Sequence, residues 1–142
     1  MFGEWSYAWH SVHYLGLSHY FYEFDIYDKE AGQFLALETR TTMMEETGIH
    51  TMPLVHCGAL DEKQLRALIG ESAFDSRFNN PTTVKIDQLM EGLYMRTEAP
   101  GFVTARAKIV RLEFVERVMQ SEHWKHQQMV PNELLPGMDI WQ

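Results

Sequence analysis

The sequence lacks a second cysteine, a long apolar run and a basic N-terminal segment. Cys57 is the only cysteine in 142 residues, so an intrachain disulfide is excluded and no second thiolate is available for a metal site. We expect Cys57 to be a buried apolar thiol in a reducing compartment. No run approaches the roughly 20 apolar residues that span a bilayer, and no secretory signal is visible. We therefore expect a soluble, cytoplasmic protein that does not associate with membranes.

Positive charge is also scarce. The chain has 12 basic and 20 acidic side chains, for a formal charge of −8. This argues against a protein that coats nucleic acid nonspecifically, because such binding depends on Lys and Arg side chains at phosphates. The deficit is uneven, since residues 1–90 hold 13 acidic and 6 basic side chains whereas residues 91–117 hold 4 and 5. Residues 91–117 are therefore the least acidic region, which is a modest indication on its own.

The sequence does contain the material for one globular domain. A chain of 142 residues can bury one core but not two ordinary ones, so we expect a single domain over residues 1–142. Alternation and aromatic content predict strands, and helical periodicity predicts helices. The expected strands surround Glu4 and cover residues 19–27, 34–37, 52–57, 90–96 and 104–111, and the expected helices cover residues 38–47, 61–69 and 112–127. This order predicts an α+β fold of mostly antiparallel sheets with flanking helices.

Two of the expected helices carry specific local signals. Asp61 is an expected N-cap, and Gln64 follows it at the spacing of a capping box. Leu112, Val115 and Met119 recur at helical spacing in the last helix. That spacing predicts a final helix, in which Phe114, Val118 and Trp124 are expected to be core residues.

The two strands at 90–96 and 104–111 are expected to form an antiparallel hairpin around the turn at Pro100-Gly101. Because side chains alternate along a strand, Glu91, Leu93 and Met95 share one face of the first strand. Thr104, Arg106 and Lys108 share one face of the second strand for the same reason. A carboxylate and several cations that converge on one sheet suit a metal-assisted phosphate site. The alternative is a solvent-facing hairpin with cross-strand ion pairs.

Four runs of the sequence carry a resemblance when they are taken in order. They are Phe2-Gly3-Glu4-Trp5, Tyr22-Glu23-Phe24-Asp25-Ile26, Glu91-Gly92-Leu93-Tyr94-Met95-Arg96 and the run from Lys108 to Phe114. They resemble motifs III, IIIa, IV and V of the ATP-dependent RNA ligases, the RNA ligase 2-like branch of the covalent nucleotidyltransferase superfamily. The resemblance covers nearly the whole chain and implies part of an ATP-grasp-like nucleotidyltransferase domain.

The resemblance also implies roles for individual residues. Glu4 matches the glutamate that binds the nucleotide ribose, and Phe24 matches the aromatic residue that stacks on adenine. Glu91 matches the glutamate that holds Mg²⁺ or Mn²⁺, and Lys108 matches the lysine that contacts the α-phosphate of ATP. Arg96 matches a basic nucleotide-binding position. Without the resemblance, Glu4 would be interpreted as a strand-edge carboxylate and Phe24 as a core residue.

One position within these motifs departs from the family. Some members carry a second lysine two residues after the first, where this sequence has Val110. Arg111 could supply a nucleotide-binding charge instead, but strict alternation places it on the face opposite Lys108.

The family's nucleophile is a lysine in a K-x-[DH]-G run upstream of motif III, and no lysine precedes Glu4. The run Lys85-Ile86-Asp87-Gln88 has part of this pattern but lies after motif IIIa and lacks the glycine. We therefore expect residues 1–142 to be the C-terminal portion of a ligase domain that does not adenylate itself.

The resemblance implies an enzyme that adenylates an RNA 5′-phosphate and joins it to a 3′-hydroxyl, as in repair of nicked or broken RNA. The alternative is a non-catalytic nucleotide- or RNA-binding remnant, or a subunit whose partner chain supplies the lysine.

Overall fold

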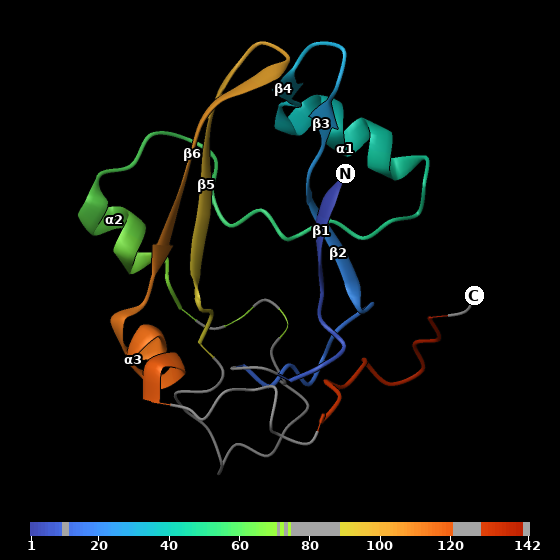
Figure 1. The fold of residues 1–142 in the computed structure, drawn as a ribbon, viewed down its shortest axis with the longest axis vertical. Coiled ribbons are helices and arrows are strands. Elements are labelled where there is room, and N and C mark those ends of the chain that lie inside the picture. Colours follow the sequence, from blue (N-terminus) through green and yellow to red (C-terminus); the bar gives the residue numbers. More distant parts are fainter. Residues whose placement is uncertain (10–11, 71, 73, 75–88, 121–128, 141–142) are drawn as a thin grey trace.

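The computed structural model describes residues 1–9, 12–70, 72, 74, 89–120 and 129–140. Within these ranges it contains three helices and three antiparallel sheets of two strands each, which confirms the α+β fold. Figure 1 shows the long β5–β6 hairpin on one side of the molecule and the β1–β2 pair on the other. No helix among the described residues is long and apolar enough to cross a membrane.

The first sheet pairs β1 (Phe2–Trp5) with β2 (Phe21–Asp25), so the strand expected around Glu4 is confirmed. Glu4 lies opposite Tyr22. The register shifts between Phe2 and Gly3, whose partners are Asp25 and Glu23, so Phe24 is an extra residue on β2. Such a bulge breaks the simple alternation of side chains. Glu23 and Asp25 consequently contact different parts of the molecule, although alternation would place them on one face.

The second sheet is a short hairpin of β3 (Tyr27–Asp28) and β4 (Gln33–Phe34), which leads directly into α1 (Leu37–Glu45). Ile26, Leu35 and Met44 form the buried cluster of this region, and Ile49 and Phe102 pack against it. Phe102 belongs to the β5–β6 hairpin, so the tip of that hairpin is fixed to the cluster. A backbone bond from the Ala36 amide to the Gly101 carbonyl, 2.9 Å long, strengthens this attachment.

The capping box predicted for the second helix is confirmed. α2 (Glu62–Ala67) begins after Asp61, whose carboxylate accepts a hydrogen bond from the Gln64 amide. The Gln64 side chain accepts a bond from the Asp61 amide in return. The two bonds satisfy donors that the first turn of a helix leaves unpaired.

The third sheet is the predicted hairpin, longer than expected, with β5 (Gly92–Ala99) and β6 (Phe102–Val110) joined at Pro100-Gly101. Gly101 has a φ of +88°, a conformation that favours glycine. Gly92 is needed for a different reason. A Cβ atom at this position would lie 1.9 Å from the Ile109 carbonyl oxygen, so only glycine allows β5 to approach β6 here.

The last helix, α3 (Leu112–Gln120), begins directly after β6. The final helix predicted from residue 112 is confirmed, and its Leu112 and Met119 side chains are 67% and 81% exposed. The segment from residue 129 onward is irregular, as predicted, and Asn132 fixes it to the N-terminal part. The Asn132 side chain accepts a bond from the Tyr14 amide and donates one to the Ser6 carbonyl, at 2.9 and 2.8 Å.

Two further expectations are wrong and one cannot be placed. Cys57 is exposed rather than buried. Residues 52–57 form no strand, and only Thr51 makes an isolated bridge, to Glu23. The Lys85-Ile86-Asp87-Gln88 run lies outside the described residues.

Candidate functional site

The register of the β5–β6 hairpin corrects the faces expected from simple alternation. Tyr94 lies opposite Lys108 and Arg96 lies opposite Arg106, so these four side chains share a face. Leu93 and Met95 lie opposite Ile109 and Ala107 on the other face. The face shared by Leu93 and Met95 and the face shared by Arg106 and Lys108 are therefore the two opposite faces of the hairpin.

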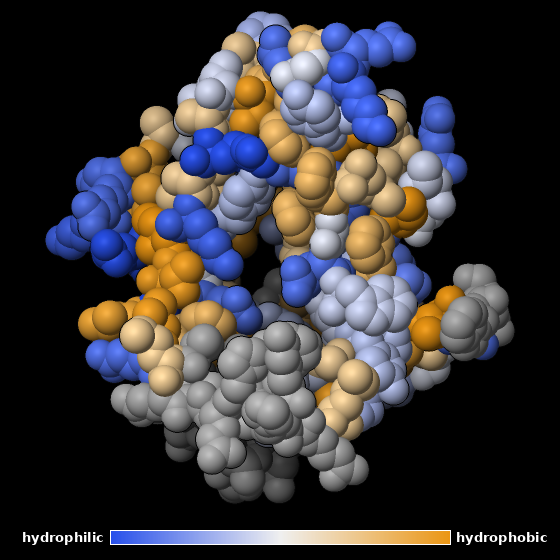
Figure 2. All heavy atoms as spheres, in the orientation of Figure 1, coloured by the Kyte–Doolittle hydropathy of each residue, from blue (hydrophilic) through white to orange (hydrophobic). Residues whose placement is uncertain are grey.

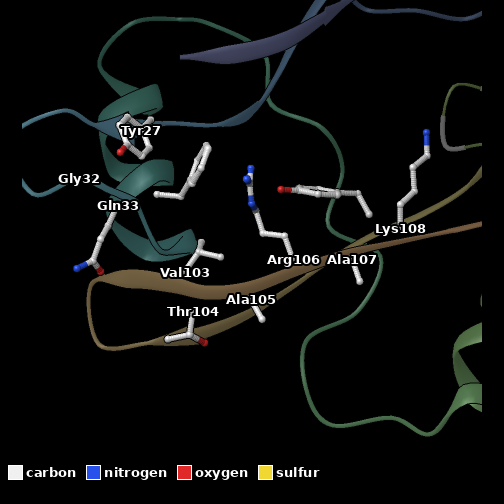
Figure 3. A pocket seen from close by; sticks show the side chains of 11 residues that line it. Tyr27, Gly32, Gln33, Val103, Thr104, Ala105, Arg106, Ala107 and Lys108 are labelled. Carbon is white, nitrogen blue, oxygen red and sulfur yellow. The ribbon is translucent and has the colours of Figure 1, made fainter.

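Thr104 does not share the face of the cations either. The register shifts between Thr97 and Glu98, whose partners are Ala105 and Val103, so Thr104 is an unpaired bulge residue. Figure 3 shows Arg106 and Lys108 on one side of β6 and Ala105 and Ala107 on the other. The Thr104 hydroxyl donates a hydrogen bond to the Thr97 carbonyl at 3.0 Å, which holds the bulge.

A buried carboxylate connects this face to the first sheet. Asp25 is fully buried and accepts a hydrogen bond from the Tyr94 hydroxyl at 2.5 Å. Arg96 and Arg106 each donate to it at 3.2 Å. Burial and the bond to Asp25 raise the pKa of Tyr94, which keeps its hydroxyl protonated as the donor. Buried charge is tolerated where it is paired and hydrogen-bonded, and Asp25 meets both conditions.

The ring of Phe24 lies beside the same tyrosine. The Phe24 and Tyr94 ring centroids are 5.8 Å apart in an edge-to-face arrangement. Tyr94 is in turn directly opposite Lys108, so the predicted adenine-stacking residue and the predicted phosphate-binding residue flank one side chain. Lys108 is exposed, and within the described part of the chain no hydrogen bond or ion pair involves its ammonium group.

A groove of about 650 Å³ lies between β6 and the β3–β4 hairpin, and we call it the β6 groove (Figure 3). Its larger and polar lining residues are Tyr27, Gln33, Phe34, Tyr94, Arg106 and Lys108. The Arg106 guanidinium lies over the Phe34 ring, 3.7 Å from its centroid. Figure 2 shows the surface hollowed between the two sides of the molecule. The face that carries Lys108 is therefore open to a ligand.

The two glutamates expected at the ribose and the metal act on a common neighbour. Glu4 is exposed on β1, and Glu91 is partly buried just before β5. Burial raises the pKa of the Tyr14 hydroxyl, and the negative charges of Glu91 and Glu4 raise it further. Charges act on a titrating group in this way only when they lie near it. Both glutamates therefore act electrostatically on Tyr14, and their roles at the ribose and at the metal stay predictions.

Arg96 and Arg111 bond to the protein itself. Besides Asp25, Arg96 donates to the Phe24 carbonyl at 3.2 Å. Arg111 donates to the Met90 and Leu89 carbonyls at 2.7 and 3.3 Å, which fixes the segment before β5. Their predicted role in nucleotide binding stays a prediction, and the structure gives both guanidinium groups a positioning role.

A second buried pair lies behind β2. Glu23 and Arg40 of α1 are both buried and form a hydrogen-bonded ion pair. Burial raises the pKa of Glu23, and Arg40 opposes that effect. The pair attaches α1 to β2, so it supports the strand that carries Phe24.

The sequence analysis missed Asp25 and Tyr94 as members of this cluster. One signal was available for Asp25, because it follows Phe24 directly in an aromatic strand, where a charged residue needs a partner. Arg106 was expected on the face of Lys108, since a period of two places both there, and the register confirms this shared face.

ATP and Mg²⁺ or Mn²⁺ are the groups implied for this site, and the residues present fit them. Lys108 offers an uncompensated cation for a phosphate, and Phe24 offers a ring beside it. No group of three or more His, Cys, Asp or Glu side chains among the described residues could hold a metal ion. Mg²⁺ does not require one, because it is commonly bound by one or two carboxylates together with substrate phosphates and water. The metal-binding role expected of Glu91 stays a prediction.

The architecture and the cluster define a small α+β protein with a cationic, aromatic-lined site suited to a nucleotide or nucleic acid. A family model described as RNA ligase matches residues 1–110, which end at the last residue of β6. The chain therefore belongs to the RNA ligase family, which supports an RNA ligase-type function and RNA as the class of substrate. No curated protein and no solved structure matches the chain.

Proposed function

We propose that this chain forms the nucleotide- and RNA-handling part of an ATP-dependent RNA ligase that adenylates a 5′-phosphate and joins it to a 3′-hydroxyl. One observation carries the proposal. The Phe24 ring and the exposed Lys108 flank Tyr94, which supports the roles proposed for the ring at a base and for the cation at a phosphate.

Each residue of the cluster has a role in this proposal. Phe24 stacks on adenine, for which aromatic contacts contribute roughly 1–3 kcal/mol per base. Lys108 contacts the α-phosphate and stabilises the negative charge that develops there. Glu4 accepts hydrogen bonds from the ribose hydroxyls. Glu91 holds a divalent metal, which neutralises phosphate charge when it is bound.

The joining step fits these roles. The oxygen of the RNA 3′-hydroxyl forms a bond to the phosphorus of the adenylated 5′-phosphate. The bond from that phosphorus to the AMP oxygen breaks, AMP leaves, and the hydroxyl proton passes to solvent. No lysine nucleophile is needed for this step, because AMP is already attached to the RNA.

Self-adenylation is tested with α-labelled ATP and Mg²⁺, followed by denaturing electrophoresis. We expect no covalently labelled band, because no lysine precedes Glu4 in a K-x-[DH]-G run. A labelled band that disappears when a single lysine is replaced would overturn this expectation and identify the nucleophile.

Binding and joining are tested separately. Calorimetric titration with ATP and Mg²⁺ should show binding that Lys108→Ala weakens about tenfold, the loss of one charge-assisted contact. Lys63→Ala is the matched control, since Lys63 is exposed on α2, outside the cluster. A nicked duplex with a pre-adenylated 5′-phosphate should be sealed by the unaltered chain and not by Lys108→Ala.

The alternative is a non-catalytic remnant that binds nucleotide or RNA, or that completes a partner chain. ATP binding without sealing of the pre-adenylated nick would support this alternative. No ATP binding at all would contradict the ligase proposal and the nucleotide-binding form of the alternative.

A further inference from the structure

We propose that the β6 groove binds an unpaired nucleotide of the RNA strand being joined, with its base on Tyr27 and its phosphates at Arg106 and Lys108. The inference rests on the proposed function and extends it, because it assigns a path for the polymer beyond the nucleotide site. The groove begins at Lys108, where the phosphate chemistry is placed, and extends toward the β3–β4 hairpin (Figure 3).

The charge of the groove differs from that of the chain. The protein has a formal charge of −8, yet the described residues that line the groove include two cations and no acid. Asp28 is near in sequence but is used locally, because its carboxylate accepts bonds from the Glu30 and Ala31 amides at 2.8 and 3.0 Å. A phosphate backbone is therefore attracted to this part of an otherwise acidic surface.

The two cations are spaced for a polymer. Arg106 and Lys108 are two residues apart on one face of β6, so their Cα atoms are about 6.6 Å apart. That separation is comparable to the spacing of successive phosphates along a stretched strand. The Arg106 side chain is 43% exposed, and one of its nitrogens is bonded to Asp25. Asp25 and Phe34 thus orient the guanidinium before any ligand arrives.

An aromatic surface completes the groove. Tyr27 is 39% exposed, and its ring packs edge-to-face on Phe34 with centroids 4.9 Å apart. Phe34 also contacts Phe2, with centroids 5.6 Å apart. The Tyr27 ring is therefore supported by other rings while part of it faces solvent. Aromatic rings beside cations are the combination that binds single-stranded nucleic acid without sequence preference.

The test uses fluorescence anisotropy with a labelled eight-residue oligoadenylate RNA, and titration with ATP as a separate measurement. Tyr27→Ala should weaken RNA binding about tenfold, and Tyr27→Phe should retain the affinity because the ring remains. Neither variant should change ATP affinity. Retained ATP binding with RNA binding that does not depend on Tyr27 would overturn this inference and leave the proposed function intact.

Charge variants at Gln33 keep the test independent of folding defects. Gln33 is exposed and lines the groove, so either charge is accommodated there. Gln33→Lys should strengthen RNA binding several-fold, and Gln33→Glu should weaken it by a similar factor, both more strongly at low salt. Equal effects of the two variants, or RNA that does not bind at all, would contradict the inference. If the unaltered chain does not bind ATP, the proposed function itself would be contradicted.

Discussion

The hydroxyl of Tyr94 donates a hydrogen bond to the carboxylate of Asp25 at 2.5 Å, and this bond joins β5 to β2 across 69 positions of the sequence. Arg96 and Arg106 bond to the same carboxylate from the same face of the hairpin. Asp25 is therefore the point at which the strand that carries Phe24 is fixed against the strand that carries Lys108. The relative position of the base-stacking and phosphate-binding groups depends on it.

Asp25→Asn should destabilise the protein by about 3 kcal/mol, because it removes the buried charge that pairs two arginines and leaves Arg96 only its 3.6 Å ion pair with Glu98. Chemical denaturation measures the loss of unfolding free energy, and the slope of that free energy against denaturant concentration (the m value) should not change. Tyr94→Phe is the control, and it removes one hydrogen bond while the ring stays, at about 1 kcal/mol. Equal losses in the two variants would show that the ion pairs contribute nothing.

Glu98→Ala should cost about 1 kcal/mol, the usual value of a helix N-cap. Both Glu98 carboxylate oxygens lie 3.1 Å from the Leu37 amide at the start of α1, although Glu98 belongs to β5. Thermal unfolding measures the change. Glu62→Ala is the matched control, since its ion pair with Arg66 is solvent-exposed and such pairs contribute little. A loss no larger than that of the control would refute a capping role for Glu98.

Gly92→Ala should disrupt the start of the hairpin and cost about 3 kcal/mol or more, because the added methyl group meets the Ile109 carbonyl. Gly70→Ala is the comparison, since the nearest atom to its added carbon is 4.0 Å away. Denaturant unfolding measures the stability of both variants, and hydrogen exchange at the β5 amides shows whether the start of the hairpin is disrupted. The close approach would be disproved by a Gly92→Ala variant as stable as Gly70→Ala.

Acidification should destabilise the protein through His50. Burial lowers the His50 pKa below its ordinary value of 6.5, and the charge of the stacked His19 lowers it further. The unfolded chain therefore binds more protons than the folded one just below pH 6.5, so stability falls as the pH drops through this value and levels off below the folded pKa. His50→Gln should flatten the dependence between about pH 7.5 and about pH 5. An unchanged slope in that variant would assign the effect to other groups.

The hairpin and the second helix could be predicted because their signals are local. Pro100-Gly101 marks the turn, and Asp61 with Gln64 defines the capping box. The order of motifs also identified the family, which needs no knowledge of register.

The faces of the strands could not be predicted, because two bulges interrupt the alternation. Neither Phe24 nor Thr104 differs in residue type from an ordinary strand residue, and only the partner strand reveals the extra position. The helical periodicity of α3 likewise indicated which side is apolar without indicating a partner for Leu112 or Met119. Residues 52–57 have strand-like composition, but β2 pairs with this segment only at Thr51.

The bulge at Thr104 divides the hairpin into two halves that are out of phase by one residue. Beyond it, Phe102 bridges to Leu35 and anchors the tip in the buried cluster. Before it, Arg106 and Lys108 keep their positions opposite Arg96 and Tyr94. Deleting Thr104 would shift Phe102 by one residue relative to Leu35, while Arg106 and Lys108 would keep their partners on β5. The bulge therefore separates the part of β6 that attaches the hairpin tip to the buried cluster from the part that carries the two cations.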